Sequence, residues 1–361
     1  MKLNLFKNKI YLRIKYLFYT SVMGIQQLNY FLKIYAPEAI KIKHLSTYKN
    51  KTIAIDANVY LYKFLYKNNH LNGLFFQIYK LQKYNIKPIF IFDGKPPEEK
   101  LKTINIRTNN KQFIKNQIIE MEYNIKNNYY NDKKLKQILK KIDKLKSKLI
   151  YVNKDVINKS IELFKLMGIH YIMADCEAEH YCAKLNKLHL VDLVLSEDMD
   201  TICCGSSITL RNYSNKSDFI TEYNFELIIN KLNINHNQFI DLCILFGNDY
   251  IKVYKNKNVY ENYLLILKYI NLKNILSYDN YILNNIQNIQ DIYKLKNIII
   301  NCNDIFEITS FKKPQIKKLK KFIKNNTNID KKIYEKILYK KQIFFKNICL
   351  KNNYYLKLIQ K

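Results

Sequence analysis

Three short apolar runs, each ending at or followed by an acid, stand out along the chain at residues 51–56, 88–94 and 191–196. Longer stretches with helical spacing separate them. Strands that are apolar along their whole length are typical of a parallel sheet buried on both faces. The pattern therefore predicts an α/β fold with a mostly parallel central sheet covered by helices.

Residues 100–148 break this alternation, because they are rich in Lys, Asn and Gln and carry sparse apolar residues at roughly helical spacing. Such a stretch buries little surface. We interpret it either as a solvated helical insertion or as a basic helical lid over a phosphate-bearing substrate. Residues after Asp249 show helical patterns, and the chain is again Lys-rich from Lys312 onward.

The chain is strongly basic, with 61 Lys and Arg against 30 Asp and Glu and a formal net charge of +31. Only Arg13, Arg107 and Arg211 are arginines, and Asn, Ile and Tyr are abundant, as an A/T-rich coding sequence produces without selection. The charge is therefore either drift or a surface for polyanions, since phosphate contacts give sequence-independent affinity. It permits a nucleic-acid partner and does not prove one.

The remaining composition excludes several classes of protein. An apolar share of 48% with a charged share of 25% excludes global disorder, and no apolar run approaches the roughly 18 residues of a membrane helix. The seven cysteines include no CxxC pair, so we interpret them as reduced, buried thiols of an intracellular protein. The six histidines show no metal-ligand spacing and are interpreted as structural.

Carboxylates gather at predicted strand ends and helix starts. Asp198 and Asp200 follow a strand at a spacing that puts both side chains on one side of extended chain, and Glu177 and Glu179 stand at an expected helix start. The carboxyl ends of parallel strands share one edge of a sheet. Carboxylates that meet there repel one another unless cations bind, which predicts Mg²⁺ or Mn²⁺. The seven candidates are Asp56, Asp93, Glu177, Glu179, Asp198, Asp200 and Asp249.

Six segments of the chain, five of which hold these acids, resemble flap endonucleases of the XPG nuclease family and occur in the family's order. The resemblance implies a PIN-like 5′ nuclease fold with a helical arch and a helix–two-turn–helix region. It also implies a two-metal, structure-specific nuclease that removes 5′ flaps from DNA in replication and repair, with all seven acids as metal ligands. The matching segments are 23–28, 53–57, 87–97, 176–179, 196–200 and 241–250.

The resemblance extends to catalytic and DNA-binding positions. Lys100 and Arg107 match a basic pair at the base of the arch that faces the scissile phosphate; seven helical residues turn about 700°, so the two side chains project within about 20° of each other. Tyr62 matches an aromatic on which a base stacks, with a core tyrosine as the alternative. Arg211 matches a substrate contact, with a structural ion pair as the alternative. The DNA-binding set also contains Gly24, Lys95, Gly247, Asn256 and Asn258.

Three departures from the family pattern concern DNA and partner binding. Residues 256–259 read Asn-Lys-Asn-Val where the family has Gly-x-Gly-Pro, whose amides hold a phosphate and K⁺; Asn is the best substitute for Gly in left-handed backbone. The interval between Asp56 and Asp93 is shorter than usual, which trims the wedge that packs on the duplex junction. Only a fragment of the sliding-clamp motif is present, at residues 342–345, so a sliding-clamp partner has no clear motif.

These features predict six segments. Residues 1–22 form a basic extension, which we interpret as a mis-start with Met23 as the true first residue, or as a targeting segment that is cleaved. The family implies a nuclear location, with organellar targeting by residues 1–22 as the alternative. The others are an N-terminal nuclease region with the start of the arch (23–130), arch and connecting helices (131–168), an internal nuclease region (169–255), a degenerate helix–two-turn–helix region (256–320) and a basic C-terminal tail (321–361).

Together these observations predict a monomeric, Mg²⁺-dependent 5′ flap endonuclease and 5′–3′ exonuclease that acts on branched DNA and does not associate with membranes. Two Mg²⁺ ions per subunit are expected, with Mn²⁺ as a substitute. A sibling nuclease with an exonuclease or junction-resolving preference would share every carboxylate and differ in arch and wedge. A non-catalytic nucleic-acid scaffold is the remote alternative, and the loss of a site acid would have indicated it; none is missing.

Overall fold

The computed structural model of the chain describes residues 24, 25, 27–66, 69–251, 258–269, 280–309 and 312–339. The expectations for residues 1–22, for Asn256 and for the clamp-motif fragment at 342–345 lie outside the described residues. A search of the described helices for one with the length and hydropathy of a membrane span finds none.

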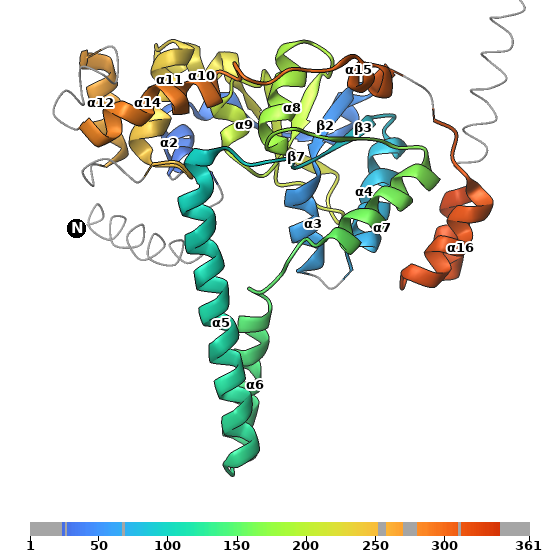
Figure 1. Cartoon of the computed structure of the whole chain (residues 1–361). Helices are drawn as coiled ribbons and strands as arrows, with labels where there is room; N and C mark the ends of the chain where they lie inside the picture. The colour runs from blue at the N-terminus through green and yellow to red at the C-terminus, as the bar shows by residue number, and fades with distance from the viewer. Residues whose placement is uncertain are drawn as a thin grey trace, which may run out of the picture.

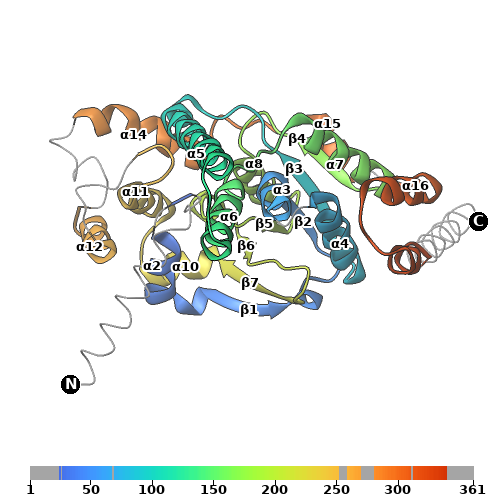
Figure 2. The ribbon, with the colours of Figure 1, turned by 90° about the horizontal axis from the view of Figure 1, so that it is seen from below.

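A mixed sheet of seven strands occupies the centre of the described residues (Figure 1, Figure 2). Its order is β1 (Ile40–His44), β7 (Phe219–Asn224), β6 (Ile208–Arg211), β5 (Leu193–Leu195), β2 (Thr52–Asp56), β3 (Lys87–Phe92) and β4 (His170–Met173). β7 is antiparallel to both of its neighbours, and the strands from β6 to β4 are parallel. The expected mostly parallel sheet is confirmed, and β2, β3 and β5 coincide with the three apolar runs.

Helices surround the sheet, and several begin at an asparagine, a residue type in which this chain is rich. The side chains of Asn69, Asn131, Asn153, Asn224 and Asn235 each accept a hydrogen bond from an amide in the first turn of the helix that follows. The helices are α2 (Leu28–Tyr35), α3 (Ala57–Leu65), α4 (His70–Lys83), α5 (Leu101–Asn127), α6 (Asp132–Lys146), α7 (Lys154–Met167), α8 (Ala178–Lys187), α9 (Asp200–Cys203), α10 (Phe225–Leu232), α11 (His236–Phe246), α12 (Val259–Tyr269), α14 (Asn280–Tyr293), α15 (Cys302–Thr309) and α16 (Ile316–Asn326), with short 3₁₀ turns at Pro37–Ala39, Leu45–Tyr48 and Glu98–Lys100.

Strand β2 is buried on both faces, which explains why its sequence is apolar at every position. Ile53 and Ile55 belong to one core together with residues of α3, α4 and α7. Ala54 lies in another core with Ala178 and Cys182 of α8. A third core gathers residues of α2, α10 and α11. A strand with helices on both faces has no solvent side, so it has no need of alternating polar residues.

Helices α5 and α6 form a long hairpin that projects from the body of the molecule (Figure 1). The 27 residues of α5 span about 40 Å. Ile118 of α5 and Ile142 of α6 are buried, whereas most other residues of the hairpin are exposed. The helical insertion expected over residues 100–148 is therefore confirmed, and the boundary expected at residue 130 falls in the turn between the two helices. We call this hairpin the arch.

The basic tail expected from residue 321 is corrected in its described part. The expected boundary falls inside α16, and residues 331–339 are helical as well. Phe322, Ile323 and Leu338 are buried in the same core as α7. The lysines of α16 are exposed on its other side, so a Lys-rich sequence still presents an apolar stripe to the core.

Candidate metal centre

Four of the predicted acids stand at the carboxyl ends of parallel strands. Asp56 is the last residue of β2, Asp93 follows β3, and Asp198 and Asp200 follow β5. β2 pairs in parallel with both β3 and β5. The three strand ends therefore lie next to one another, and they bring the four side chains to one edge of the sheet.

The other three acids come from helix ends that face the same edge. Glu177 is the N-cap of α8, Glu179 lies in the first turn of that helix, and Asp249 follows α11. The amide of Ala178 donates to Asp93 Oδ1 at 2.9 Å, which ties the start of α8 to the end of β3. All seven acids interact electrostatically with other members of the set, so the structure brings them into one group, which we call the acid cluster.

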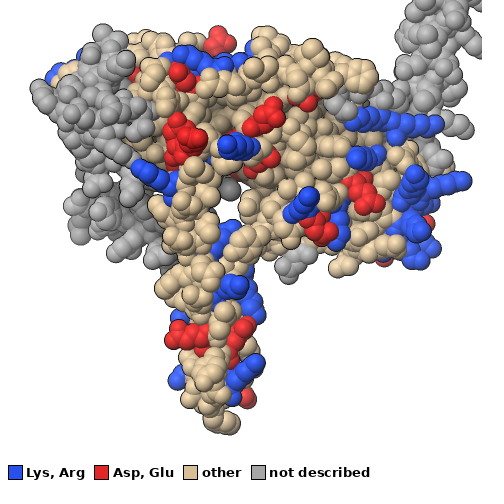
Figure 3. All heavy atoms as spheres, in the orientation of Figure 1, with Lys and Arg blue, Asp and Glu red and all other residues tan. Residues whose placement is uncertain are grey.

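Lys100, just before α5, lies inside the acid cluster rather than beside it. Its Nζ donates to Glu177 Oε1 and lies 3.0 Å from Asp249 Oδ2 and 3.8 Å from Glu179 Oε1. Burial lowers the pKa of Lys100, but the three carboxylates outweigh burial and raise that pKa above its ordinary value. Arg107 Nη2 lies 2.6 Å from Asp249 Oδ1, so both cations reach one carboxylate, as their seven-residue spacing predicts. Figure 3 shows basic and acidic side chains together where the arch joins the body.

Ser196 orders the strand-end acids with a single hydroxyl. Its Oγ donates to Asp56 Oδ2 at 2.9 Å and accepts from the amide of Asp198 at 3.0 Å. Asp198 Oδ1 in turn accepts from the amide of Asp200 at 3.0 Å. The loop after β5 therefore holds its two carboxylates in place through its own backbone.

Gly24 closes the acid cluster from the N-terminal side. The next amide, of Ile25, donates to Asp200 Oδ1 at 3.1 Å. Gly24 has φ +75°, and a Cβ built on it would stand 1.9 Å from Asp198 Oδ1 and 2.7 Å from Asp200 Oδ1. Only glycine fits this position, because both the backbone conformation and the available space exclude a side chain. The structure thus places Gly24 against two predicted metal ligands.

The electrostatics of the acid cluster favour bound cations. Burial, reinforced by Asp93, raises the pKa of Asp56 to about 8. Burial also raises the pKa of Glu179 and that of Asp200 well above their ordinary values. Divalent cations oppose such shifts, because they supply the missing positive charge. Crowded carboxylate oxygens are the ligands that Mg²⁺ prefers, so the residues present fit a magnesium site.

The predicted DNA-binding residues that the structure describes occupy varied settings. Tyr62 on α3 is half-buried, with Lys111 Nζ of the arch 5.8 Å from its ring centroid. Lys95 is exposed in the segment after β3, and Gly247 ends α11 with φ +83°. Asn258 caps α12, because its Oδ1 accepts from the amide of Glu261 at 2.9 Å.

Arg211 contacts the loop that carries Asp198 and Asp200. Its Nη2 donates to the backbone oxygen of Glu197 at 2.7 Å, and its Nη1 lies 2.6 Å from Met199 Sδ. Both partners belong to the loop that carries Asp198 and Asp200. These contacts favour the structural alternative for Arg211, although its partners are a carbonyl and a sulfur rather than a carboxylate.

His180 is a residue that the sequence analysis assigned a structural role. The described residues contain one group of metal-binding side chains with ligand atoms all within 4.8 Å of one another, formed by Glu177, Glu179 and His180. The signal was present in the sequence, since Glu177 and His180 are three residues apart and share one face at the start of a helix. The missed spacing is Glu-x-x-His, and the group of described residues that meets there contains no cysteine and no second histidine.

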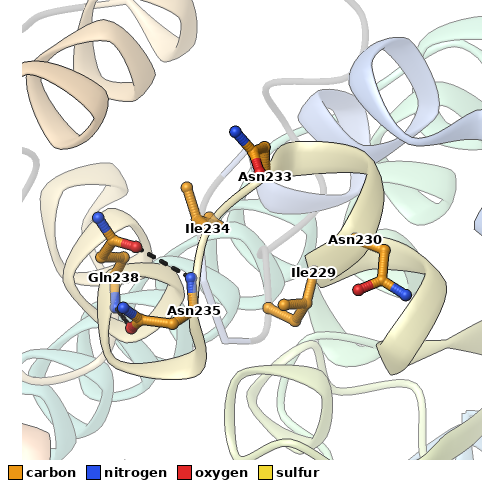
Figure 4. Close-up of a pocket in the computed structure, with 6 residues that line it drawn as sticks. All are labelled: Ile229, Asn230, Asn233, Ile234, Asn235 and Gln238. Atoms are coloured by element: carbon orange, nitrogen blue, oxygen red, sulfur yellow. Dashed lines mark hydrogen bonds between the residues drawn. The ribbon is translucent and has the colours of Figure 1, made fainter.

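A shallow pocket elsewhere on the surface is lined by uncharged residues. It lies at the turn between α10 and α11 and is lined by Ile229, Asn230, Asn233, Ile234, Asn235 and Gln238 (Figure 4). None of the seven acids lines it. Asn235 and Gln238 already bond each other's backbone in a capping box, so these polar side chains are used within the fold.

Comparison with known families and sequences agrees with this site. The XPG N-terminal domain matches residues 23–114 and the XPG I-region matches residues 168–249, and all seven acids lie within these two spans. Flap endonuclease 1 of Enterocytozoon bieneusi is 32% identical over 70% of this chain and 72% of its own length. Flap endonuclease 1 of Tetrahymena thermophila is 30% identical over 83% of both chains.

Comparison with solved structures supports the fold. The catalytic core of Rad2 in complex with a DNA substrate is similar with a TM-score of 0.64 and 24% identity, over 86% of this chain and 97% of that one. That likeness extends beyond the two matched spans and includes the arrangement of a mostly parallel sheet with surrounding helices.

Proposed function

Because this chain belongs to the flap endonuclease family of XPG nucleases, we propose that it cleaves DNA phosphodiesters near the base of a 5′ flap in a Mg²⁺-dependent, structure-specific reaction. The observation that carries the proposal is the meeting of seven acids around Lys100 at the base of the arch. Such a centre can offset the charge that develops when a phosphodiester is attacked by another oxygen.

The acids come from two kinds of element, and together they would hold the metal ions. The strand-end set is Asp56, Asp93, Asp198 and Asp200, and the helix-end set is Glu177, Glu179 and Asp249. A pair of Mg²⁺ ions, or Mn²⁺ in their place, would be held by these acids and would supply a water of lowered pKa and positive charge for the phosphodiester oxygens. The protein's part is to hold the carboxylate oxygens in place with the Ser196 hydroxyl, the Ile25 amide and the start of α8.

Lys100 and Arg107 are the groups that would hold the scissile phosphate. Both reach Asp249 from the arch side, at 3.0 and 2.6 Å. A phosphate that enters beside Asp249 meets an ammonium and a forked guanidinium, and charge-assisted bonds from both strengthen as negative charge grows on its oxygens. We assign these two residues the stabilisation of the developing charge.

The arch and Tyr62 would position the nucleic acid. The hairpin of α5 and α6 rises directly from Lys100, so a single strand passing along it is delivered to the acid cluster. Tyr62 lies near the arch base, as its contact with Lys111 indicates, and offers a ring on which the base beside the scissile bond stacks.

A panel of labelled substrates tests the proposal. We expect cleavage near the base of a 5′ flap in Mg²⁺ and in Mn²⁺, and none in a chelator. A preference for blunt duplex ends or for a four-way junction would instead identify the sibling activities. Binding without cleavage of any substrate in Mg²⁺ would contradict the proposal and support a scaffold.

We further propose that the protein acts as a monomer. All seven acids and Lys100 come from one chain, so the site does not need a second copy to complete it. Light scattering should give the mass of one subunit, and a mass of two subunits would contradict the proposal.

A further inference from the structure

We propose that His180 supplies a nitrogen ligand at the helix-end side of the acid cluster, and that it raises the affinity of this position for borderline divalent ions such as Co²⁺ relative to Mg²⁺. The inference deepens the proposed function and rests on its assignment of Glu177 and Glu179 as metal ligands. It concerns which ion the site prefers, and not whether the site cuts DNA.

The geometry provides three donors in one place. One ring nitrogen of His180 and one oxygen each of Glu177 and Glu179 lie within 4.8 Å of one another. Glu177 and His180 are three residues apart at the start of α8, so both project from the same side of the helix. A Glu-x-x-His pair on one helix is the arrangement with which carboxylate-bridged di-iron and di-manganese proteins hold their metals.

The ring nitrogens of His180 make no hydrogen bond to the described residues that would explain why a histidine stands here. His180 is 2% exposed, and its Nε2 has no hydrogen-bond partner among the described residues. Its Nδ1 lies 3.8 Å from Glu177 Oε2, which is too long for a hydrogen bond. Buried polar atoms are nearly always paired, so an unpaired imidazole next to two carboxylates indicates a partner that the protein chain does not supply.

Packing alone is the competing explanation. The imidazole ring lies edge-on to the ring of Tyr293, with centroids 6.1 Å apart. A ring retained only for this contact would not need its nitrogens, and phenylalanine would serve equally well. The two explanations therefore differ in what His180→Phe does: it keeps the ring and removes both nitrogens.

The chemical consequence is selectivity among ions. Mg²⁺ takes oxygen ligands, whereas imidazole favours later first-row metals, and affinity for a nitrogen-containing site rises from Mn²⁺ to Co²⁺ and Ni²⁺. An imidazole beside carboxylates therefore adds affinity for Co²⁺ and little for Mg²⁺. Carboxylates alone would discriminate less between these two ions.

The experiment titrates the full chain, wild type, His180→Phe and His180→Ala, with CoCl₂ and with MgCl₂ in separate calorimetric runs. We expect both variants to lose about 10-fold or more in Co²⁺ affinity while Mg²⁺ affinity changes by less than about 3-fold. His189→Asn is the matched control, because His189 lies just past the far end of the same helix, is exposed and has a positive φ that asparagine tolerates; it should leave both affinities as in the wild type. A parallel loss of both affinities in the His180 variants would overturn the proposal and leave a structural role.

A second measurement can already overturn the proposal with the wild-type chain, even if the variants fail to fold. Pulsed electron paramagnetic resonance of Mn²⁺ bound to the wild-type chain should show ¹⁴N modulation from a directly coordinated imidazole, and His180→Phe should lack it. Absence of ¹⁴N modulation in the wild type would overturn the proposal. Flap cleavage in Mg²⁺ is measured separately, so a protein with the ¹⁴N signal but no cleavage contradicts the proposed function and supports the ligand.

Discussion

Lys100 shows how one residue links the arch to the acid cluster. In the structure its ammonium is the cation closest to Glu177 and contacts Asp249 as well. Carboxylates buried without a cation are costly, since breaking a buried ion pair by removing one partner typically costs about 3–5 kcal/mol. The same side chain that would meet the phosphate also offsets the negative charge of these carboxylates.

The first prediction concerns that stabilising role. Lys100→Met should lower the melting temperature of the protein in a chelator by more than it does in saturating Mg²⁺, because bound ions replace the missing charge. Differential scanning calorimetry in both conditions measures the effect. The exposed Lys95→Met is the control and should change neither value; an equal drop for Lys100→Met in both conditions would contradict the account.

The second prediction concerns Asp198. Asp198→Asn keeps an oxygen that can accept from the amide of Asp200 but removes a charge, so cleavage should fall by about 100-fold or more while DNA affinity remains. Steady-state cleavage assays measure the loss of activity, and fluorescence anisotropy in Ca²⁺ measures the DNA affinity. Asp192→Asn is the matched control, because Asp192 precedes β5, at the opposite end of the strand from Asp198, and pairs with Lys51. This variant should cleave normally. Normal cleavage by Asp198→Asn would remove it from the ligand set.

The third prediction concerns Gly24. Gly24→Ala should weaken Mg²⁺ binding and cleavage together, because its Cβ would collide with Asp198 Oδ1 and its φ of +75° disfavours alanine. Gly168→Ala is the control, since Gly168 also has a positive φ, at +66°, but meets the backbone of Lys312. We expect Gly168→Ala to lose about 1–2 kcal/mol of stability and to keep its Mg²⁺ affinity.

At the scale of elements, the acid cluster depends on how helices dock onto the sheet. The start of α8 is tied to β3 through Asp93, and the start of α11 is tied to α9 through His236. His236 sits in a tight space, because a Cβ on Gly205 would lie 2.8 Å from its ring. Since α9 follows Asp198 and α11 leads to Asp249, this contact helps to set the spacing between two acids.

The fourth prediction is a pH dependence that arises at this contact. Burial lowers the pKa of His236 below 6.5, so in the range below 6.5 the unfolded chain binds more protons than the folded one. The free energy of unfolding should therefore rise with pH through this range. His236→Gln should show a smaller change between about pH 5 and pH 7.5 in urea unfolding, and an unchanged slope would contradict the assignment.

At the scale of the whole molecule, the net charge of +31 is far larger than one DNA substrate requires. Exposed lysines occur on the arch, which projects from the body, and on α16, which lies at one end of the body (Figure 1, Figure 3). A charge spread in this way cannot all contact one duplex at once. Part of it is therefore compositional, as the scarcity of arginine suggests.

The fifth prediction concerns how many phosphate contacts the basic surface makes with DNA. Binding of a flap substrate in Ca²⁺, followed by fluorescence anisotropy between about 50 and 200 mM salt, should weaken with a slope that corresponds to about 6–10 phosphate contacts. A control duplex without a flap should give a shallower slope, because it does not engage the arch. A slope near zero for both would show that the basic surface does not bind DNA.

The sequence by itself determined the central strands and the acids that follow them. β2, β3 and β5 were predictable because strands buried on both faces are continuously apolar, and Asp56, Asp93, Asp198 and Asp200 follow from strand ends that share an edge. β1 and β4 were not predicted, because five and four residues with polar positions give too little pattern. Helix α16 was not predicted either, because its many lysines make its few apolar residues hard to recognise as one face of a helix.

Only the tertiary structure decided what surrounds those acids. Lys100 lies 77 residues from Glu177 in the chain, and Gly24 lies 174 residues from Asp198, so no local pattern could place either one inside the acid cluster. The unpaired nitrogen of His180 is likewise a property of the packed environment. Local periodicity reports which face of an element is buried, whereas the contacts of a charged side chain depend on which distant segments the fold brings beside it.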